Sequence, residues 1–308
     1  MRRSLVLLAL LVAGCGGGDD GNGASAPPAT VALDFTPNAA HAGLYAADPE
    51  RIVIRPPGGG GADSLKVLES GRADMAVADI HDLGLARERG ADLVGVGALV
   101  QRPLAAVIAR RESGVRQPRD LEGRRVGVAG LPSDDAVLRA VVESDGGDFD
   151  RVERVTIGFG AVANLLAGKV DAATAFWNAE GVVLRERGLA TREFRLDDYG
   201  APRYPELVLV VTRAALSDRR EAVAAALEAI AAGTERALAQ QDESVREIAS
   251  VSEADPALVR AQLEAIAPAL SPPVALDRDA LEAWADFAAD FEILDRRPDV
   301  DAAFDLPD

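Results

Sequence analysis

The chain has 308 residues, 48% of them hydrophobic, and its 50 acidic side chains outnumber its 33 basic ones. A formal charge of −17 makes nucleic acid an unfavourable partner. The single cysteine, Cys15, excludes an internal disulfide, a thiolate metal site and a cysteine nucleophile in the body of the chain. A chain of this length can bury one large core or two modest ones, and we favour two.

The first residues are typical of a secretory signal. Arg2 and Arg3 precede an apolar run over residues 5–12, which is much shorter than the roughly 20 residues that span a membrane. The sequence Val-Ala-Gly-Cys at 12–15 matches a bacterial lipobox, so residues 1–15 are predicted to be a signal peptide with lipidation of Cys15. The alternative is a chance cysteine after an ordinary signal. Residues 16–30 contain no large apolar side chain and predict a flexible linker.

Short apolar strands then alternate with helical patterns. Strands are predicted at 31–33, 52–54, 75–78 and 93–98, with helices near 62–70 and 80–89. A second unit repeats this rhythm, with strands at 126–128, 152–156 and 172–176 and helices near 133–143, 161–167 and 179–187. Such alternation is typical of parallel sheets, so two α/β lobes are predicted.

A short internal sequence repeat, called the echo below, supports the division into two lobes. Residues 71–76 and 168–173 share the order glycine, base, apolar residue, aspartate and small residue. Glycine suits the end of a helix and the base suits the negative end of its dipole, so each segment should end a helix and open a strand. The alternative is that any turn from helix to strand selects such residues.

Two apolar segments, 104–109 and 207–211, flank the second unit and are predicted to be hinge crossovers. With these crossovers, residues 31–103 plus 207–308 are predicted to form lobe 1 and residues 104–206 to form lobe 2. Helices near 214–240, 243–252, 256–268 and 278–290, broken at Gly233, Pro256 and Pro268, should complete lobe 1. Residues from Asp295 onward are polar and are predicted to be a surface tail.

The densest cluster of candidate ligand-binding residues follows the first strand. It contains a carboxylate, an aromatic face, an amide, an imidazole and a phenol, namely Asp34, Phe35, Asn38, His41 and Tyr45. Ligands of open α/β sheets bind beyond the carboxyl ends of strands, and this set could stack on a flat polar ring and bond its edges. The alternative is an ordinary turn in which Asn38 caps a helix whose surface carries His41 and Tyr45.

Two further strand-to-helix junctions lie in lobe 2. Trp177, Asn178 and Glu180 mirror the first cluster, although Asn and Glu also suit a helix start. Residues 130–135, with Ser133, offer backbone amides that could bind an anion, which Asp134 and Asp135 oppose. Arg102 is the one nearby candidate cation beside the acidic Asp34, Asp134 and Glu180. The negative charges of these side chains favour a ligand with N–H donors, such as an aminopyrimidine, over nitrate or a sulfonate.

The chain resembles the bacterial thiamine-pyrimidine-precursor binding proteins, which share a family with the eukaryotic thiamine pyrimidine synthases. The matching motifs are LDFTPNAAHAGLYAA, GRADMAVA, VQRPLAAVIA, GLPSDDAVL, GFGAVANLLAGKVDAATAFWNAEG and DYGAPRYPELVLVV, in family order. The resemblance implies a type II periplasmic-binding fold, with two α/β lobes and two hinge crossovers. It implies that Phe35 and Tyr45 enclose the ring while Asn38, His41, Trp177 and Glu180 contact it. Asp79 and Tyr199 complete the set of predicted site residues.

The synthases of the resembled family use a lysine and a histidine near the third strand and a cysteine-rich run. Here the lysine position falls on Ala78 and the histidine position near Asp82, one residue from His81, and no cysteine-rich run exists. Covalent capture of pyridoxal phosphate is therefore lost, and we expect neither an enzyme nor a cofactor or metal.

The expected protein is a monomeric solute-binding lipoprotein outside the cytoplasm, serving an ABC permease and ATPase and touching the membrane through its lipid alone. The resemblance gives a thiamine pyrimidine precursor as its ligand, with riboflavin as an alternative. A sensor lipoprotein with the same fold remains a further alternative.

Overall fold

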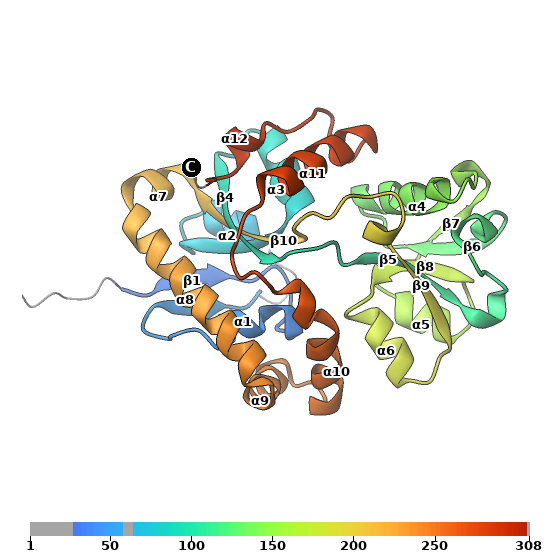
Figure 1. Cartoon of the computed structure of the whole chain (residues 1–308), viewed down its shortest axis with the longest axis horizontal. Coiled ribbons are helices and arrows are strands. Elements are labelled where there is room, and N and C mark those ends of the chain that lie inside the picture. The colour runs from blue at the N-terminus through green and yellow to red at the C-terminus, as the bar shows by residue number, and fades with distance from the viewer. Residues whose placement is uncertain (1–26, 58–63, 307–308) are drawn as a thin grey trace, which may run out of the picture.

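The computed structural model describes residues 27–57 and 64–306, which form two lobes lying side by side (Figure 1). The predicted signal peptide, Cys15 and most of the predicted linker lie outside the described residues. The end of the linker prediction is wrong, because Ala29 and Thr30 already belong to the first strand. Within the described residues, no helix is both long and apolar enough to cross a membrane.

Lobe 1 contains a five-stranded sheet in the order β2-β1-β3-β10-β4. Its strands are β1 (Ala29–Ala32), β2 (Ile52–Arg55), β3 (Met75–Asp79), β4 (Leu93–Val100) and β10 (Leu207–Thr212). The first three pair in parallel, whereas β10 is antiparallel to both of its neighbours. Every residue of β4 is buried, as expected for a strand covered on both faces.

Helices cover both faces of this sheet, and the alternation of side chains along its strands separates two cores. Ala76 and Ala78 of β3 pack with α2 (Ser64–Glu69), α3 (Ile80–Glu88) and α11 (Arg278–Asp290). Met75 and Val77 of the same strand pack with α1 (Ala42–Tyr45), α8 (Arg220–Ala239), α9 (Gln241–Ser252) and α10 (Pro256–Ile266) on the other face. The period of two is that of a strand buried on both sides.

Lobe 2 contains a second five-stranded sheet in the order β7-β6-β8-β5-β9. Its strands are β5 (Ala105–Arg110), β6 (Arg125–Val128), β7 (Glu153–Thr156), β8 (Ala172–Phe176) and β9 (Thr191–Arg195), and its main helices are α4 (Pro132–Ser144), α5 (Ala161–Leu166) and α6 (Glu180–Glu186). The sequence did not predict β9, because this edge strand buries only Phe194 among charged neighbours.

The segments predicted as crossovers are strands inside the two sheets, and this placement corrects the prediction. Segment 104–109 forms most of β5 in lobe 2, and segment 207–211 forms most of β10 in lobe 1. The chain passes between the lobes through residues 101–104 on the way out and 196–206 on the way back (Figure 1). The returning segment rejoins lobe 1 beside the point of departure, where Glu206 N donates to Val100 O at 3.0 Å.

The predicted helix-to-strand turns have the same structure in both lobes. Gly71 and Gly168 adopt φ of 70° and 65°, which favour glycine. Asp74 bonds the first parallel strand of its lobe twice, accepting from Thr30 N at 2.9 Å and donating its own N–H to Thr30 O at 2.8 Å. Asp171 does the same to Arg125, at 3.0 and 2.8 Å. The prediction that each echo ends a helix and opens a strand is confirmed.

The helices after β10 include α7 (Arg213–Asp218), and the predicted break at Gly233 is wrong, because α8 runs through it. Gly233 instead allows α1 and α8 to touch, since a Cβ there would clash with the Gly43 carbonyl and with Ala47. The break at Pro256 is confirmed as the start of α10, and α10 ends at Ile266 before Pro268.

The prediction of a surface tail from Asp295 is also wrong. A short helix, α12 (Val300–Ala303), is followed by Phe304, and the side chains of Val300, Ala303 and Phe304 are buried. Phe304 bridges to Gly95 of β4 and meets Trp284 edge-on at 5.9 Å. The sequence alone does not identify the few apolar residues of the tail as core residues, because the space that Phe304 fills beside Gly95 is formed by the folded sheet.

Candidate ligand-binding site

Exposed apolar side chains are concentrated where parallel strands end. Phe35 follows β1, Leu131 follows β6, Phe159 follows β7 and Phe176 ends β8, and these side chains are 58%, 49%, 80% and 39% exposed. They are four of the seven large hydrophobic residues that are exposed in the described part of the chain, and they include all of its exposed aromatic rings. Exposed aromatic rings at the carboxyl ends of strands are typical of a binding surface.

The sequence prediction included Phe35 but missed Phe159. A signal was present, because Phe159 stands between Gly158 and Gly160 shortly after the strand predicted at 152–156. Gly158 has φ of 57°, and a Cβ there would meet no atom within 4 Å. A phenylalanine left in solvent on such a turn gains nothing from folding, so its exposure favours a function.

Asp34 is held in place by a buried histidine. His41 is fully buried, and its Nε2 lies 2.8 Å from Asp34 Oδ1. The backbone N–H of Asn38 donates to His41 Nδ1 at 3.3 Å, so the ring proton is on Nε2 and points to the carboxylate. The predicted capping role of Asn38 is confirmed, because its Oδ1 accepts from Ala40 N at 2.9 Å. The alternative of a surface-exposed His41 is wrong.

Tyr45 lies at the end of α1 and is half-buried. Burial raises the pKa of its phenol, and the nearby carboxylate of Glu247 raises it further. The tyrosine therefore lies near Glu247 of α9, and its predicted contact with the ligand stays a prediction.

A second carboxyl group stands at the neighbouring strand end. Asp79 is the last residue of β3 and caps α3 by accepting from His81 N at 2.7 Å. Burial raises the pKa of Asp79 to about 6, opposed by the hydrogen bond from His81 and assisted by the charge of Asp34. Two adjacent strand ends thus present two carboxyl groups that can accept N–H groups from a ligand.

Trp177 is buried, with 1% of its surface exposed, and two arginines lie close to its ring. The guanidinium of Arg195 lies 4.2 Å and that of Arg102 5.6 Å from the ring centroid. The indole N–H donates to Pro103 O at 3.0 Å. Trp177 thus ties the end of β8 to the outgoing crossover in this structure, and its predicted contact with the ligand is untested.

The two residues predicted beside Trp177 differ in how they are bonded. Glu180 begins α6, and its carboxylate accepts from Phe176 N at 3.0 Å, which fixes the loop between them. Asn178 is buried, and its Oδ1 has no hydrogen-bond partner within the described structure. A buried amide oxygen without a donor costs free energy, which a ligand N–H would recover.

The groups expected to favour an anion are already occupied. Arg102 pairs with the buried Asp197 of the returning crossover at 2.7 Å. The N–H groups of Gly130 and Leu131 donate to Asp134 Oδ2 at 2.6 and 2.7 Å. Asp134 therefore occupies the backbone amides of this turn, in agreement with the expectation that it opposes an anion there.

The remaining predicted residues have structural surroundings. Ser133 is half-buried in the first turn of α4. Tyr199 packs edge-on against Phe194 of β9, with ring centroids 5.5 Å apart, within lobe 2. Neither placement tests a ligand contact.

His81 is part of a buried chain of aromatic residues. Trp284 Nε1 donates to His81 Nδ1 at 3.1 Å, so His81 Nε2 carries the proton that is donated to the Tyr204 hydroxyl at 3.2 Å. Burial lowers the pKa of His81 to about 4, which keeps the ring neutral. Both ring nitrogens are occupied by side chains of the protein.

Two cavities of the described structure lie away from the predicted ligand-binding residues. A cavity of about 450 Å³ lies beside α4 and the end of α11, and one of about 300 Å³ lies beside α2 and α3. Neither is lined by a predicted ligand-binding residue. The described residues contain no group of three His, Cys, Asp or Glu side chains suited to a metal ion.

The family described as NMT1/THI5 like matches residues 38–244. The chain belongs to this family. Over 254 residues it is 31% identical to the formylaminopyrimidine-binding protein of Halalkalibacterium halodurans, an alignment that covers 79% of this chain and 76% of that protein. A relative with this degree of similarity is therefore a binding protein.

Solved structures establish the fold. The aliphatic sulphonate binding protein SsuA of Escherichia coli superposes with a TM-score of 0.73 at 17% identity, over 90% of this chain and 97% of that one. The desulfurization enzyme DszB superposes with a TM-score of 0.64 at 17% identity, over 89% and 96%. The predicted periplasmic-binding fold of two α/β lobes is confirmed, and the fold itself serves both binding proteins and an enzyme.

Proposed function

We propose that this protein is the solute-binding component of an ABC importer and that it binds a pyrimidine precursor of thiamine. The observation that carries the proposal is the set of exposed aromatic rings at the ends of parallel strands in both lobes, Phe35, Phe159 and Phe176. Flat heterocycles stack on such rings. The family membership and the similarity to a formylaminopyrimidine-binding protein support the same ligand class.

Hydrogen bonding favours a ligand rich in N–H groups. Asp34 and Asp79 stand at neighbouring strand ends of lobe 1, and Asn178 Oδ1 is an acceptor without a donor in lobe 2. An aminopyrimidine supplies donors to such groups while remaining nearly neutral. A sulfonate or nitrate would have to displace Asp197 from Arg102 or Asp134 from its turn.

The ligand class can be tested by thermal unfolding with a panel of solutes. Formylaminopyrimidine, hydroxymethylpyrimidine, riboflavin and an alkanesulfonate are compared at equal concentration. One of the pyrimidines should raise the melting temperature by several degrees, since a ligand at about 100 times its Kd stabilises by roughly 2.7 kcal/mol. A shift with the sulfonate alone, or with none of the pyrimidines, would reject the proposal.

The proposal includes a lipid anchor at Cys15 and a place outside the cytoplasm. Expression of the whole chain in a bacterial host fed radiolabelled palmitate should label the protein and carry it to the membrane fraction. Cys15→Ser should abolish the label. A labelled Cys15→Ser protein, or an unlabelled wild type, would contradict the anchor.

Binding without chemical change completes the proposal. Ala78 offers no amine for a Schiff base, and His81 is enclosed by Trp284 and Tyr204. Prolonged incubation with the bound pyrimidine should return the ligand unaltered by mass spectrometry. Conversion of the ligand by the purified chain, with or without pyridoxal phosphate, would instead identify an enzyme.

A further inference from the structure

The two lobes differ greatly in charge. Residues 104–206 contain 15 basic and 17 acidic side chains, whereas residues 31–103 and 207–308 together contain 16 basic and 31 acidic ones. Lobe 2 is thus nearly neutral while lobe 1 carries a net charge of −15. Within lobe 2 the basic side chains are not evenly distributed.

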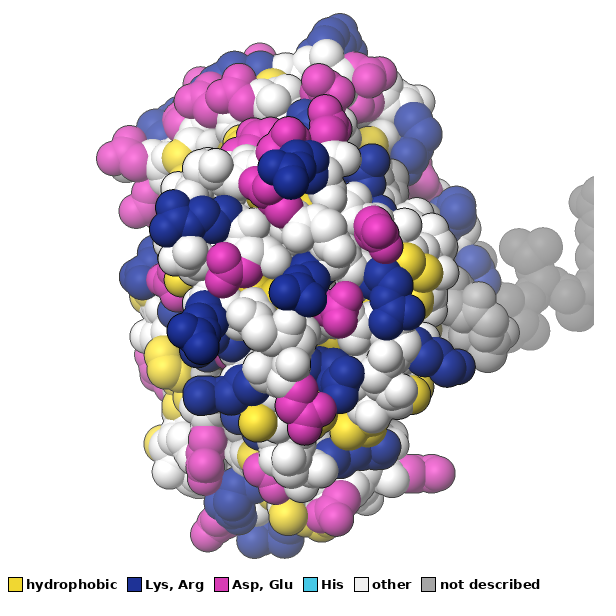
Figure 2. All heavy atoms as spheres, turned by 90° about the vertical axis from the view of Figure 1, so that its right-hand side faces the viewer, with side chains coloured by type: hydrophobic (Ala, Val, Ile, Leu, Met, Phe, Trp, Pro, Cys, Tyr) yellow, Lys and Arg dark blue, Asp and Glu magenta, His cyan; other side chains and the backbone are white. Residues whose placement is uncertain are grey.

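Six arginines lie at the end of lobe 2 that is farthest from the crossovers. They follow the carboxyl end of β5, flank the amino ends of β6 and β9, or follow the end of α6. We call this set the distal arginine face: Arg111, Arg116, Arg124, Arg125, Arg187 and Arg192. The chain enters β5 at Ala105 and leaves β9 at Arg195, which are the opposite ends of these strands. Figure 2 faces lobe 2 and shows Lys and Arg side chains spread across it, with Asp and Glu side chains between them.

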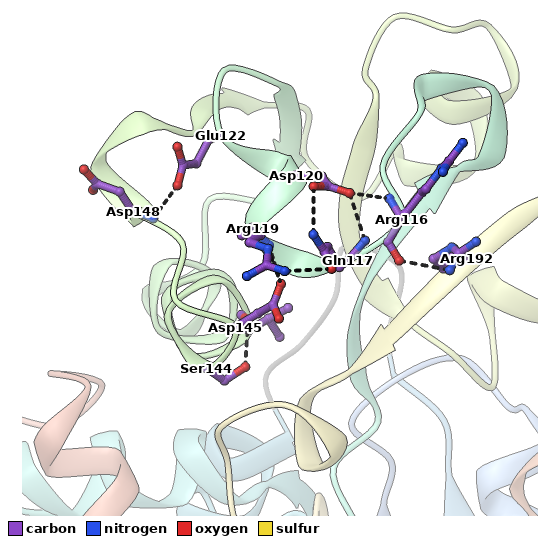
Figure 3. Close-up of polar contacts among 10 residues, drawn as sticks. Arg116, Gln117, Arg119, Asp120, Glu122, Ser144, Asp145, Asp148 and Arg192 are labelled. Atoms are coloured by element: carbon purple, nitrogen blue, oxygen red, sulfur yellow. Dashed lines mark hydrogen bonds and ion pairs between the residues drawn. The ribbon is translucent and has the colours of Figure 1, made fainter.

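None of the six has a carboxylate within ion-pair distance in the described structure, although 14 other arginines have one. Arg192 donates to the backbone oxygen of Arg116 at 2.9 Å, and no dashed line reaches the guanidinium of Arg116 in Figure 3. All but Arg192 are exposed. The face therefore presents guanidinium groups with no carboxylate at ion-pair distance in the described structure, although the exposed Glu153 stands in register with Arg125.

Three of the acidic residues among these arginines are engaged by other groups. Glu112 pairs with Arg110 at 2.8 Å. Asp120 accepts from the backbone N–H groups of Arg116 and Gln117, which lowers its pKa (Figure 3). Asp171 accepts from the backbone of Arg125. These carboxylates hold turns together and do not pair with the guanidinium groups of the face.

We propose that the distal arginine face rests on an anionic phospholipid surface. Guanidinium groups bind phosphate well, and basic side chains near an anionic bilayer are attracted to its surface. A protein partner fits less well, because interfaces between proteins have an apolar centre and none of the exposed large hydrophobic residues of the described chain belongs to the face. Lobe 1, with its charge of −15, would be repelled by such a surface.

The test is co-sedimentation of the chain from residue 15, carrying Cys15→Ser so that no lipid is attached, with vesicles. The chain should bind phosphatidylglycerol vesicles at least tenfold better than phosphatidylcholine vesicles at about 0.01 M salt and lose this preference near 1 M, as the screening length falls from about 30 to about 3 Å. Absence of binding to phosphatidylglycerol at low salt would overturn the proposal and leave an acidic protein as the partner to seek.

Matched variants separate this face from the charge of the whole chain. Changing its six arginines to glutamine should reduce vesicle binding at least tenfold. The control changes six exposed arginines outside lobe 2, each likewise without a carboxylate at ion-pair distance among the described residues, and should keep the binding: Arg51, Arg55, Arg72, Arg89, Arg246 and Arg296. Equal loss in both variants, or none in the first, would refute the assignment. Both variants should retain the ligand-induced rise in melting temperature, so this test does not depend on the proposed cargo.

Discussion

The backbone N–H of Leu104 donates to the carboxyl group of Glu206 at 2.8 Å, which joins the outgoing crossover to the returning one. Glu206 is buried, and its own backbone also bonds Val100 and Ile80. Burial raises the pKa of Glu206, and the nearby charge of Asp79 raises it further. The junction between the lobes therefore contains a carboxyl group whose ionisation is disfavoured by its surroundings.

Substitutions of Glu206 should separate its hydrogen bond from its charge. Glu206→Gln keeps an acceptor for Leu104 N and should change the free energy of unfolding by less than about 1 kcal/mol. Glu206→Ala leaves that N–H buried without a partner and should cost about 1–3 kcal/mol. Urea unfolding at neutral pH measures both, and equal losses in the two variants would show that the charge is needed.

Asp79 should make stability fall as pH rises. Its folded pKa of about 6 lies above the usual 3.8, so the folded chain binds this proton more tightly. The stabilisation is complete below about pH 4 and is lost as pH rises through 6. Asp79→Asn keeps the cap of α3 but not the titration, so the stability of the variant relative to wild type should increase between pH 4 and 7.

The buried His81 acts in the opposite direction. Its folded pKa of about 4 lies below the usual 6.5, so its contribution is lost as pH falls through this range. Because His81 is present in both proteins, its effect cancels when the Asp79→Asn variant and wild type are compared at each pH. A difference that is independent of pH would show that Asp79 does not titrate as the structure indicates.

Removal of the exposed rings should weaken ligand binding without affecting the fold. Phe159→Ala and Phe35→Ala should each raise Kd at least tenfold, about 1.4 kcal/mol, by calorimetry. Their stability should change by less than about 0.5 kcal/mol, since both rings are exposed. Val53→Ala on β2, another exposed apolar residue, serves as the control and should leave both quantities unchanged.

The contact of Gly95 with Phe304 should show coupling between the tail and the sheet. Phe304→Ala should cost about 3–5 kcal/mol because it empties a buried site. Gly95→Ala should also destabilise, since its new Cβ would lie 2.5 Å from the Phe304 ring. The double variant should lose less than the sum of the two, because the smaller side chain makes room. Strict additivity in urea unfolding would exclude the contact.

Most of the strands and helices could be predicted because each follows a clear period of apolar residues. Elements that depend on a distant partner could not. Gly233 lies inside a helix because α1 approaches it closely at Gly43, a contact that the local sequence does not reveal. The polar tail belongs to the core because Phe304 packs where Gly95 has no side chain. β9 was missed because an edge strand with one buried residue lacks the alternation that identifies a strand.

The position of the candidate site was predictable, because strands followed by polar and aromatic residues identify the ends of a parallel sheet. The direction of each side chain was not. His41 turns inward to hold Asp34, and Trp177 turns toward Pro103. Phe159 turns outward, which a pattern of apolar residues taken alone would not distinguish from a core position.

Val100 and Leu207 are partners in register on the adjacent antiparallel strands β4 and β10. Without residues 101–206, these two strands would be an ordinary hairpin lacking only its turn. Lobe 2 is thus a whole domain inserted at a hairpin tip, with its two ends side by side. Exchanging this domain between relatives therefore requires two cuts that lie side by side in lobe 1. The resulting chimeric proteins would combine lobe 1 of one relative with lobe 2 of another, including the distal arginine face.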